Sequence, residues 1–299
     1  MVMPDAVTIR NDRLTATIAA KGAELQSLVP AGGADVMWEG DPAVWGWHAP
    51  NLFPIVGALT DDTLIHEGKS YPVKQHGFLR HSVCDVVSQA TDTCTFRLTD
   101  NEDTQAQYPF AFELMIAYRI VADRLEGEWS LRNPAQEALY ASVGLHPAFR
   151  RPLGNAPRAA HVVLFDKSEP APIRRLAGPQ IGPEPKPTPV QDRVLHVRDE
   201  LFDAGAIIFD RLTSRKLTYG APGGPAVELD FPDFPDLGIW AKPGATPFLC
   251  LEPWQGMASP QGFAGEFSKK PGVIALAPGE TRLWRYSIRP LREMPALPS

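Results

Sequence analysis

The sequence predicts an all-β protein built from packed antiparallel sheets, and three observations support this fold class. Proline and glycine are frequent, with 31 and 24 of the 299 residues, and a proline inside a helix costs about 3 kcal/mol. Hydrophobic residues alternate with polar ones along many short segments, which is the pattern of a half-buried strand. No window of a dozen residues keeps a helical period without a proline or glycine inside it. Because 44% of the residues are hydrophobic, a disordered chain is excluded.

The first expected element is a hairpin that turns at Asn11 and Asp12, and a second antiparallel pair turns at Ala122 and Asp123. In their four arms, apolar residues recur at alternate positions: Val7, Ile9, Leu14, Ala16, Ile18, Phe112, Leu114, Ile116, Tyr118, Leu125, Trp129 and Leu131. Shorter strands are expected at residues 161–166, 206–210, 226–231, 237–241, 248–251, 273–276 and 282–288. Strands spaced in this way indicate packed antiparallel sheets.

Residues 168–192 contain seven prolines and form the one candidate linker in the sequence. A linker between domains would need a self-sufficient hydrophobic core on each side of it. The half of the chain after this segment contains too few expected strands to form such a core. We therefore expect one domain over residues 1–299, with 168–192 as a long surface loop inside it.

Charge and cysteine content exclude several classes of protein. The net charge is −6 and basic residues form no block, which argues against a nucleic-acid partner. Three cysteines without C-x-x-C spacing predict neither a disulfide framework nor a zinc site. The start has no secretory apolar segment, and no apolar run approaches the ~18 residues of a membrane span. We expect a soluble cytoplasmic protein with reduced thiols and no membrane partner.

Familiar catalytic motifs are missing from the sequence. The seven histidines form no H-x-H or H-E-x-x-H pair, so we expect no metal site. The chain also has no G-x-S-x-G elbow and no phosphate-binding P-loop.

Three short segments instead place a titratable side chain beside a residue that restricts the backbone: Lys-Gln-His-Gly-Phe-Leu-Arg at 74–80, Gly-Leu-His-Pro-Ala-Phe at 144–149 and Cys-Leu-Glu-Pro-Trp-Gln-Gly at 250–256. His146 and Glu252 precede proline, which holds each of them extended. Since proline lacks an N–H, we expect strand pairing to stop there, so that both side chains project from strand ends into a cleft. Gly77 after His76 indicates a close backbone approach or a bulge. Taken singly, each segment is better explained as a polar residue satisfied in a turn.

Together the three segments resemble the aldose 1-epimerase (galactose mutarotase-like) superfamily, and the bacterial branch that includes LacX-like proteins in particular. The resemblance is carried by His-Gly-Phe-x-Arg at 76–80, Leu-His-Pro-x-Phe at 145–149 and Cys-x-Glu-Pro-Trp-x-Gly at 250–256, with support from residues 51–57 and 237–240. It runs in order from about residue 7 to residue 290.

The resemblance implies a large twisted antiparallel β-sandwich whose concave face binds a free aldose, with no metal or other cofactor. In such enzymes a glutamate takes the proton of the C1 hydroxyl while a histidine protonates the ring oxygen. The ring opens and then closes as the other anomer. Carried over by motif, Glu252 is the base and His146 the acid, while His76, Arg80 and Trp240 bind the sugar.

Two physical expectations accompany these roles. Anomer exchange is expected to need the acid and the base on opposite sides of one C–O unit. Burial of Glu252 against Trp254 and Phe248 is expected to disfavour its charge and so to raise its pKa.

The chain departs from the family's pattern at two positions. Ala58 stands where relatives commonly carry an arginine, so Arg80 or Lys74 would have to substitute for it. Gly205 stands where an aspartate is usual, and Asp203 lies two residues earlier. Because positions two apart in a strand share a face, Asp203 is a candidate for sugar binding, with a turn aspartate as the alternative.

Trp45 and Trp47 precede the segment at 51–57. We interpret them as core residues, and a stacking platform for the apolar face of a sugar is the alternative.

The favoured function is therefore a mutarotase acting on a hexose or related aldose. A non-catalytic sugar-binding or sensing protein on the same fold and a hexose-6-phosphate 1-epimerase are the alternatives. A phosphorylated sugar would need a cationic cluster, for which Lys74, Arg80 and Arg150 are candidates. A glycoside hydrolase or lyase ranks last, because a second carboxylate facing Glu252 would have to come from Asp203, Asp210 or Asp230.

Overall fold

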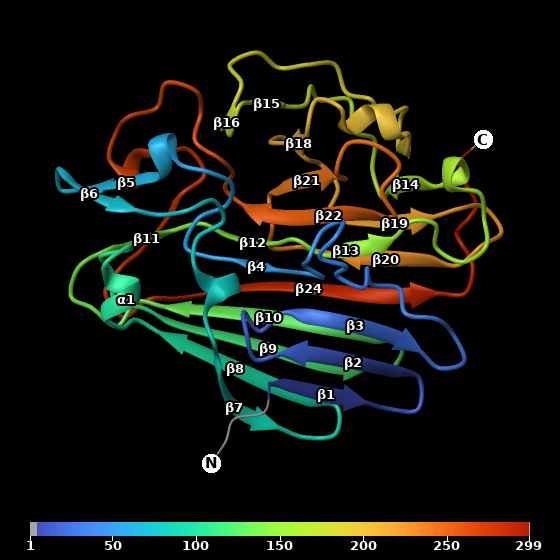
Figure 1. The fold of residues 1–299 in the computed structure, drawn as a ribbon, viewed down its shortest axis with the longest axis horizontal. Coiled ribbons are helices and arrows are strands. Elements are labelled where there is room, and N and C mark those ends of the chain that lie inside the picture. The colour runs from blue at the N-terminus through green and yellow to red at the C-terminus, as the bar shows by residue number, and fades with distance from the viewer. Residues whose placement is uncertain (1–4, 299) are drawn as a thin grey trace.

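The computed structural model describes residues 5–298, and its regular structure is almost entirely β (Figure 1). A three-stranded sheet contains β1 (Ala6–Arg10), β2 (Leu14–Ala19) and β3 (Leu25–Pro30). A nine-stranded antiparallel sheet has the spatial order β17 (Val194–His196), β14 (Val162–Phe165), β19 (Lys216–Gly220), β20 (Ala226–Asp230), β24 (Thr281–Leu291), β10 (Arg124–Arg132), β9 (Glu113–Val121), β8 (Thr93–Thr99) and β7 (Asp85–Gln89).

The sheet that carries the candidate site has six strands. Its order is β18 (Ile207–Phe209), β21 (Asp236–Trp240), β22 (Phe248–Gln255), β12 (Val143–Leu145) and β4 (Asn51–Leu52), with β13 (Ala148–Arg150) also paired to β22. Three two-stranded ribbons complete the strands: β5 (Thr63–His66) with β6 (Lys69–Pro72), β11 (Leu139–Ala141) with β23 (Ile274–Leu276), and β15 (Leu176–Ala177) with β16 (Gln180–Ile181).

Helical structure is confined to short pieces. The α-helix α1 covers Glu102–Gln105, and 3-10 turns cover Thr60–Asp62, Leu79–His81, Arg158–Ala160, Asp199–Phe202 and Phe267–Lys269. No helix among residues 5–298 is long and apolar enough to cross a membrane.

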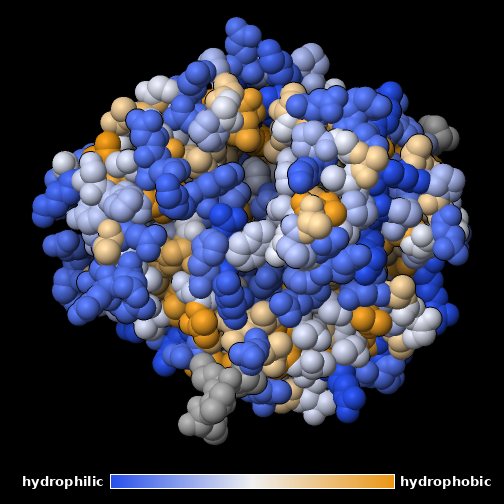
Figure 2. All heavy atoms as spheres, in the orientation of Figure 1, coloured by the Kyte–Doolittle hydropathy of each residue, from blue (hydrophilic) through white to orange (hydrophobic). Residues whose placement is uncertain are grey.

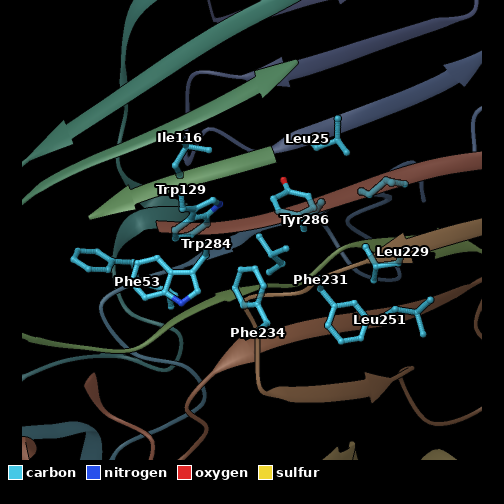
Figure 3. Packing of buried hydrophobic residues seen from close by; sticks show 14 of the residues in the cluster. Leu25, Phe53, Ile116, Trp129, Leu229, Phe231, Phe234, Leu251, Trp284 and Tyr286 are labelled. Atoms are coloured by element: carbon cyan, nitrogen blue, oxygen red, sulfur yellow. The ribbon is translucent and has the colours of Figure 1, made fainter. Parts of the chain in front are cut away.

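A large hydrophobic cluster fills the space between the sheets (Figure 3). Trp129 and Trp284 lie opposite each other in β10 and β24 and are fully buried. Leu251 from the six-stranded sheet belongs to the same cluster, which extends from Val7 to Ile288. The face of the molecule seen in Figure 2 is largely hydrophilic, with hydrophobic residues in small groups.

The all-β prediction is confirmed, and each expected strand is present. The opening hairpin forms β1 and β2, and the residues predicted to alternate inward, such as Ile9 and Ala16, are buried. One boundary expectation is wrong: β22 does not stop pairing before Pro253 but continues to Gln255.

The local geometry explains why a proline is tolerated inside β22. The N–H of Leu251 donates to the carbonyl of Pro147 over 3.1 Å, so residue 253, two positions on, turns its nitrogen toward the same side. The other edge of β22 pairs with β21, and this pairing continues through Leu237 and Pro253. The N–H that Pro253 lacks would face Leu145, the last residue of β12, so the proline interrupts only the ladder on that side.

Part of the proline-rich segment lies beside the edge of the six-stranded sheet. We call residues 174–181, which include β15 and β16, the strap. Arg174 exchanges backbone hydrogen bonds with Ile208 of β18, and Figure 1 shows β15 and β16 at the opposite end of the view from β1. The first residue of the strap thus pairs with the edge strand β18 and extends the sheet beyond it.

Candidate functional site

Successive side chains of strand β22 point to opposite faces of the sheet, so alternate residues face the main core and the candidate site. Leu249 and Leu251 belong to the large cluster between the sheets. The side chains at the positions between them lie on the other face of the sheet, where Cys250 joins an apolar cluster and Glu252 and Trp254 line a cavity. A single strand therefore supplies both core and site.

The cavity has a volume of about 300 Å³ and lies on the face of the six-stranded sheet that is turned away from the main core. It brings together five of the six residues predicted for the site: Glu252, His146, His76, Arg80 and Trp240. The rest of its lining consists of Trp45, Gly57, Gln75, Leu176, Pro179, Gly205, Ala206, Ile208, Trp254 and Ala258.

His146 and Glu252 are in direct contact at the cavity. Nε2 of His146 lies 3.1 Å from Oε2 of Glu252, and both side chains are almost fully buried. The expectation that acid and base lie on opposite sides of one C–O unit is therefore wrong, because no reacting group fits between two atoms at this distance. The pair instead presents a nitrogen and an oxygen side by side.

Burial controls the protonation of this pair. It raises the pKa of Glu252 well above its usual range, in the expected direction, since a buried carboxylate loses its hydration. It lowers the pKa of His146 to about 3 for the same reason, despite a hydrogen bond within the residue that favours the charged ring. Both shifts favour the uncharged forms, so burial favours a proton of this contact on the carboxyl rather than on the imidazole.

The backbone and two tryptophans fix the ring of His146. It lies in the break between β12 and β13, as its X-Pro position predicts. The ring stacks on Trp45 at a centroid distance of 5.2 Å and an interplanar angle of 27°. Trp240 meets the same ring edge-on at 5.9 Å. The imidazole is thus oriented by packing on two sides.

His76 reaches the cavity from a strained turn. Its φ is +67°, followed by Gly77 at +70°, and both lie in the left-handed region. A Cβ on Gly77 would lie 2.2 Å from the carbonyl oxygen of Phe53, which confirms the predicted close backbone approach. Burial, followed by the neighbouring His146 and Arg80, lowers the pKa of His76 well below its usual value.

Arg80 is the cation of the cavity lining. Its Nη2 donates to the carbonyl of Gln75 over 2.9 Å, and its guanidinium lies 5.2 Å from the ring centroid of Trp47. Within residues 5–298, its buried Nε has no hydrogen-bond partner.

The other two cations that might have joined Arg80 lie outside the cavity lining. Lys74 pairs with Asp62 at 2.8 Å, and Arg150 pairs with Glu39 at 2.8 Å. Ala58 is buried and lies outside the cavity lining as well.

Asp203 is the one predicted site residue that the structure leaves out. It is exposed and ends a 3-10 turn with helical backbone angles (φ −60°, ψ −31°). The argument that it shares a strand face with Gly205 is wrong, because this segment is a turn rather than a strand. Gly205 reaches the cavity with a φ of +77°.

Several lining residues were missed or assigned to other roles. Trp45 both packs against an apolar cluster and lines the cavity, so core packing describes only part of its role. Leu176 and Pro179 come from the segment expected only to be a surface loop. Ala206 and Ile208 belong to an expected strand, but nothing in a short apolar strand identifies which face meets a ligand.

Three potential metal ligands also converge here. The ligand atoms of His146, Cys250 and Glu252 lie within 4.8 Å of one another. Burial and the nearby Glu252 raise the pKa of Cys250 well above its usual value.

The chain is similar to known proteins over nearly its whole length. The model of the aldose 1-epimerase family matches residues 5–289. The chain is 28% identical to the plasmid-encoded protein LacX of Lactococcus lactis subsp. lactis, over 94% of this chain and 98% of LacX. A galactose mutarotase related enzyme from Lactobacillus acidophilus superposes with a TM-score of 0.89 at 30% identity, covering 97% of this chain and all of the other. A galactose mutarotase-like protein from Lactobacillus casei gives 0.89 at 28% identity, with 95% and 99% covered.

With the match extending over nearly its whole length, the chain belongs to the aldose 1-epimerase family, and its fold is the galactose mutarotase-like β-sandwich.

Proposed function

We propose that this protein interconverts the α and β anomers of an unphosphorylated aldose, with Glu252 as base and His146 as acid. The observation that carries the proposal is the 3.1 Å contact between Nε2 of His146 and Oε2 of Glu252 at the cavity. The hydroxyl oxygen O1 and the ring oxygen O5 of a cyclic sugar are bonded to the same carbon. A nitrogen and an oxygen side by side match that pair of oxygens.

Ring opening moves one proton at each oxygen. The carboxylate of Glu252 takes the proton of O1–H while Nε2–H of His146 gives its proton to O5. The C1–O5 bond breaks and C1=O1 becomes an aldehyde. After rotation about C1–C2, neutral His146 takes the O5–H proton and the Glu252 carboxyl protonates O1, so the ring closes on the other face of C1 and the pair is restored.

The one-proton state of the pair suits this cycle. Burial favours the proton on Glu252, which is the arrangement that closes the ring. Ring opening requires the same proton on His146, and hydrogen bonds from the sugar's hydroxyl groups would stabilise that charged arrangement. The two states differ only in the position of one proton, so neither direction needs a proton from bulk solvent.

The charges around the cavity support a neutral sugar rather than a sugar phosphate. Arg80 lines the cavity, whereas Lys74 and Arg150 are paired with acidic partners elsewhere. A phosphate dianion is usually held by several cationic or N–H donors.

Anomer exchange, followed by polarimetry or NMR, tests the proposal on free and 6-phosphorylated aldoses. Glu252→Gln should lower kcat by about 100-fold or more, because a positioned acid or base contributes about 10²–10⁴-fold. Glu128→Gln, at an exposed glutamate of β10, is the matched control and should leave the rate unchanged. Equal rates for wild type and Glu252→Gln would refute catalysis by this pair, and sugar binding retained in that case would favour the non-catalytic alternative.

A further inference from the structure

The order of chain segments across the six-stranded sheet gives the cavity two unlike ends. From one edge to the other the order is the strap, β18, β21, β22, β12 and β4, and Phe53 directly after β4 bridges to Gly77. Glu252 on β22 therefore lies between the two ends. One end is formed by β18 and the strap, and the other by the turn that carries His76.

The end at His76 is polar. His76, Arg80 and Gln75 line it, and their side chains all carry hydrogen-bonding nitrogens. Hydroxyl groups of a sugar can be paired at this end.

The opposite end is apolar, and we call it the wall: Leu176, Pro179, Ala206 and Ile208. Leu176, Ala206 and Ile208 belong to one apolar cluster with Trp254 and Ala258, which also line the cavity. The wall contains no charged side chain, amide or hydroxyl.

The backbone of the wall also has few groups to offer. The N–H and C=O of Ile208 are bonded to Arg174, and the C=O of Gly205 accepts from Arg175 over 2.8 Å. Pro179 has no N–H. A hydroxyl pressed against the side chains of this wall would therefore lose water and find few protein groups to replace it, although Arg175 reaches Gly205 of the same lining.

The wall is held in place at several points. The guanidinium of Arg174 is 2.9 Å from Asp210. Gln180 donates to Thr60 over 2.6 Å, and the N–H of Ile181 donates to the carbonyl of Ser259 over 2.9 Å. Because these contacts fix both ends of the strap, the wall cannot easily move away to let water solvate a buried hydroxyl.

We infer that the preferred substrate is a deoxyaldose, in which one carbon beside the C1–O5 unit carries hydrogen or methyl where a common hexose carries hydroxyl or hydroxymethyl. This inference rests on the proposed function, which puts C1 and O5 at Glu252 and His146 between the two ends. The carbons on either side of that bond, C2 and C5, then extend toward opposite ends of the cavity. One of them meets His76 and Arg80, and the other meets the wall.

The size of the preference can be bounded. An apolar pocket discriminates against an added hydroxyl by about 100-fold at most, because the extra group can be partly accommodated. We therefore expect kcat/KM to be about 10- to 100-fold higher for the matching deoxyaldose than for its parent hexose.

Anomer exchange is measured for galactose and glucose beside their 2-deoxy and 6-deoxy forms. A preference for the 2-deoxy sugars places C2 at the wall, and a preference for the 6-deoxy sugars places C5 there. Rates for both parents equal to those of their deoxy forms would overturn the inference while leaving the proposed function intact.

Substitution at the wall supplies an independent test. Ile208→Thr keeps the branched shape and adds a hydroxyl, so it should reduce the preference about tenfold. Ile181→Thr makes the same change in the same apolar cluster but outside the cavity lining, and it should leave the preference unchanged. If Ile208→Thr does not fold, Ala206→Ser serves in its place. An equal loss of preference in the Ile181→Thr control would also contradict the role of the wall.

Binding separates failure of the inference from failure of the proposed function. If no sugar shows exchange, the proposed function fails. Titrations of the same sugars, followed by the fluorescence of Trp45 and Trp240, then decide the inference alone. Tighter binding of a deoxyaldose would uphold the preference, and equal dissociation constants would overturn it.

Discussion

The N–H of Gly57 donates to Nδ1 of His76 over 3.2 Å. A ring nitrogen that accepts a hydrogen bond carries no proton, so the proton of the neutral ring lies on Nε2. Nε2 lies 3.3 Å from the side-chain nitrogen of Gln75, so with the proton on Nε2 the Gln75 amide must turn its oxygen toward the ring; both residues line the cavity. His76 is thus held as a neutral donor, and a second proton on Nδ1 would oppose the Gly57 N–H.

Two substitutions of His76 separate its contact with Gly57 from its contact with substrate. In His76→Asn, the amide oxygen can still accept from Gly57, and asparagine tolerates the positive φ of this position. The Nε2 donor is lost, so KM should rise about tenfold with little change in melting temperature. His76→Ala removes both contacts and should also lower the free energy of unfolding by about 1–3 kcal/mol. Equal stability losses in the two variants would contradict this division.

The pH dependence of kcat/KM should follow the one-proton pair rather than two ordinary groups. With ordinary pKa values, the Glu252 carboxylate and the His146 imidazolium would coexist only between about pH 4.5 and 6.5. Because the pKa of His146 is lowered to about 3 and that of Glu252 is raised well above 4.5, the pair keeps its single proton over a wider range. Activity should therefore persist above pH 6.5. Rates corrected for uncatalysed exchange at pH 5.5 and 7.5 should agree within about threefold, and a tenfold fall would contradict the coupled pair.

Asp236 should make stability depend on pH. Its side chain is buried and accepts from the N–H of Gly256 over 3.0 Å, and burial raises its pKa to about 6. A raised pKa means that the folded protein keeps a proton that the unfolded chain releases near pH 4. The contribution of Asp236 to the free energy of unfolding is therefore fully present below pH 4, and about 2–3 kcal/mol of it is lost as the pH rises through 6.

Asp236→Asn can still accept from Gly256 and cannot ionise. Denaturant unfolding at pH 4 and pH 8 should show the variant more stable than wild type at pH 8 and similar to it at pH 4. Asp12→Asn, at an exposed turn, is the matched control and should retain the pH dependence of wild type. An unchanged pH dependence in Asp236→Asn would show that Asp236 does not cause it.

Pro147 and Pro253 should matter more for rate than for stability. Each follows a residue of the proposed acid–base pair, and the N–H that Pro253 lacks would point toward Leu145 at the end of β12. Replacement by alanine frees the backbone of His146 or Glu252, so kcat should fall severalfold while unfolding free energy changes by less than about 1 kcal/mol. A loss of stability without a loss of rate would assign both prolines to a structural role.

The alternation of apolar residues was sufficient to predict the strands, because a strand with one buried face records that face at every second position. It was not sufficient for β22, because Pro253, judged from the local sequence alone, predicts the end of a strand. Its nitrogen faces β12, so the pairing of β22 with β21 on the other edge continues past it. The identity of a neighbouring strand is a long-range property that the local pattern does not contain.

The residues of the candidate site likewise divide into those that a local motif predicts and those that carry no local signal. His76, His146 and Glu252 were predicted because each lies in a short motif next to glycine or proline. Leu176 and Pro179 carry no such signal, since an apolar residue in a proline-rich segment reads as an ordinary loop. Asp203 was predicted by strand alternation in a segment that is a turn, so the argument failed with the secondary structure on which it rested.

Strand β22 also limits the kinds of sequence change that this site can accept. Because successive side chains alternate between the main core and the cavity, inserting or deleting one residue ahead of Glu252 would move its carboxyl into the core and turn Leu251 toward the sugar. New specificities can therefore arise by substitution in β22 but not by a change in its length. The strap carries no such constraint, and insertions there would reshape the cavity while leaving the acid–base pair in place.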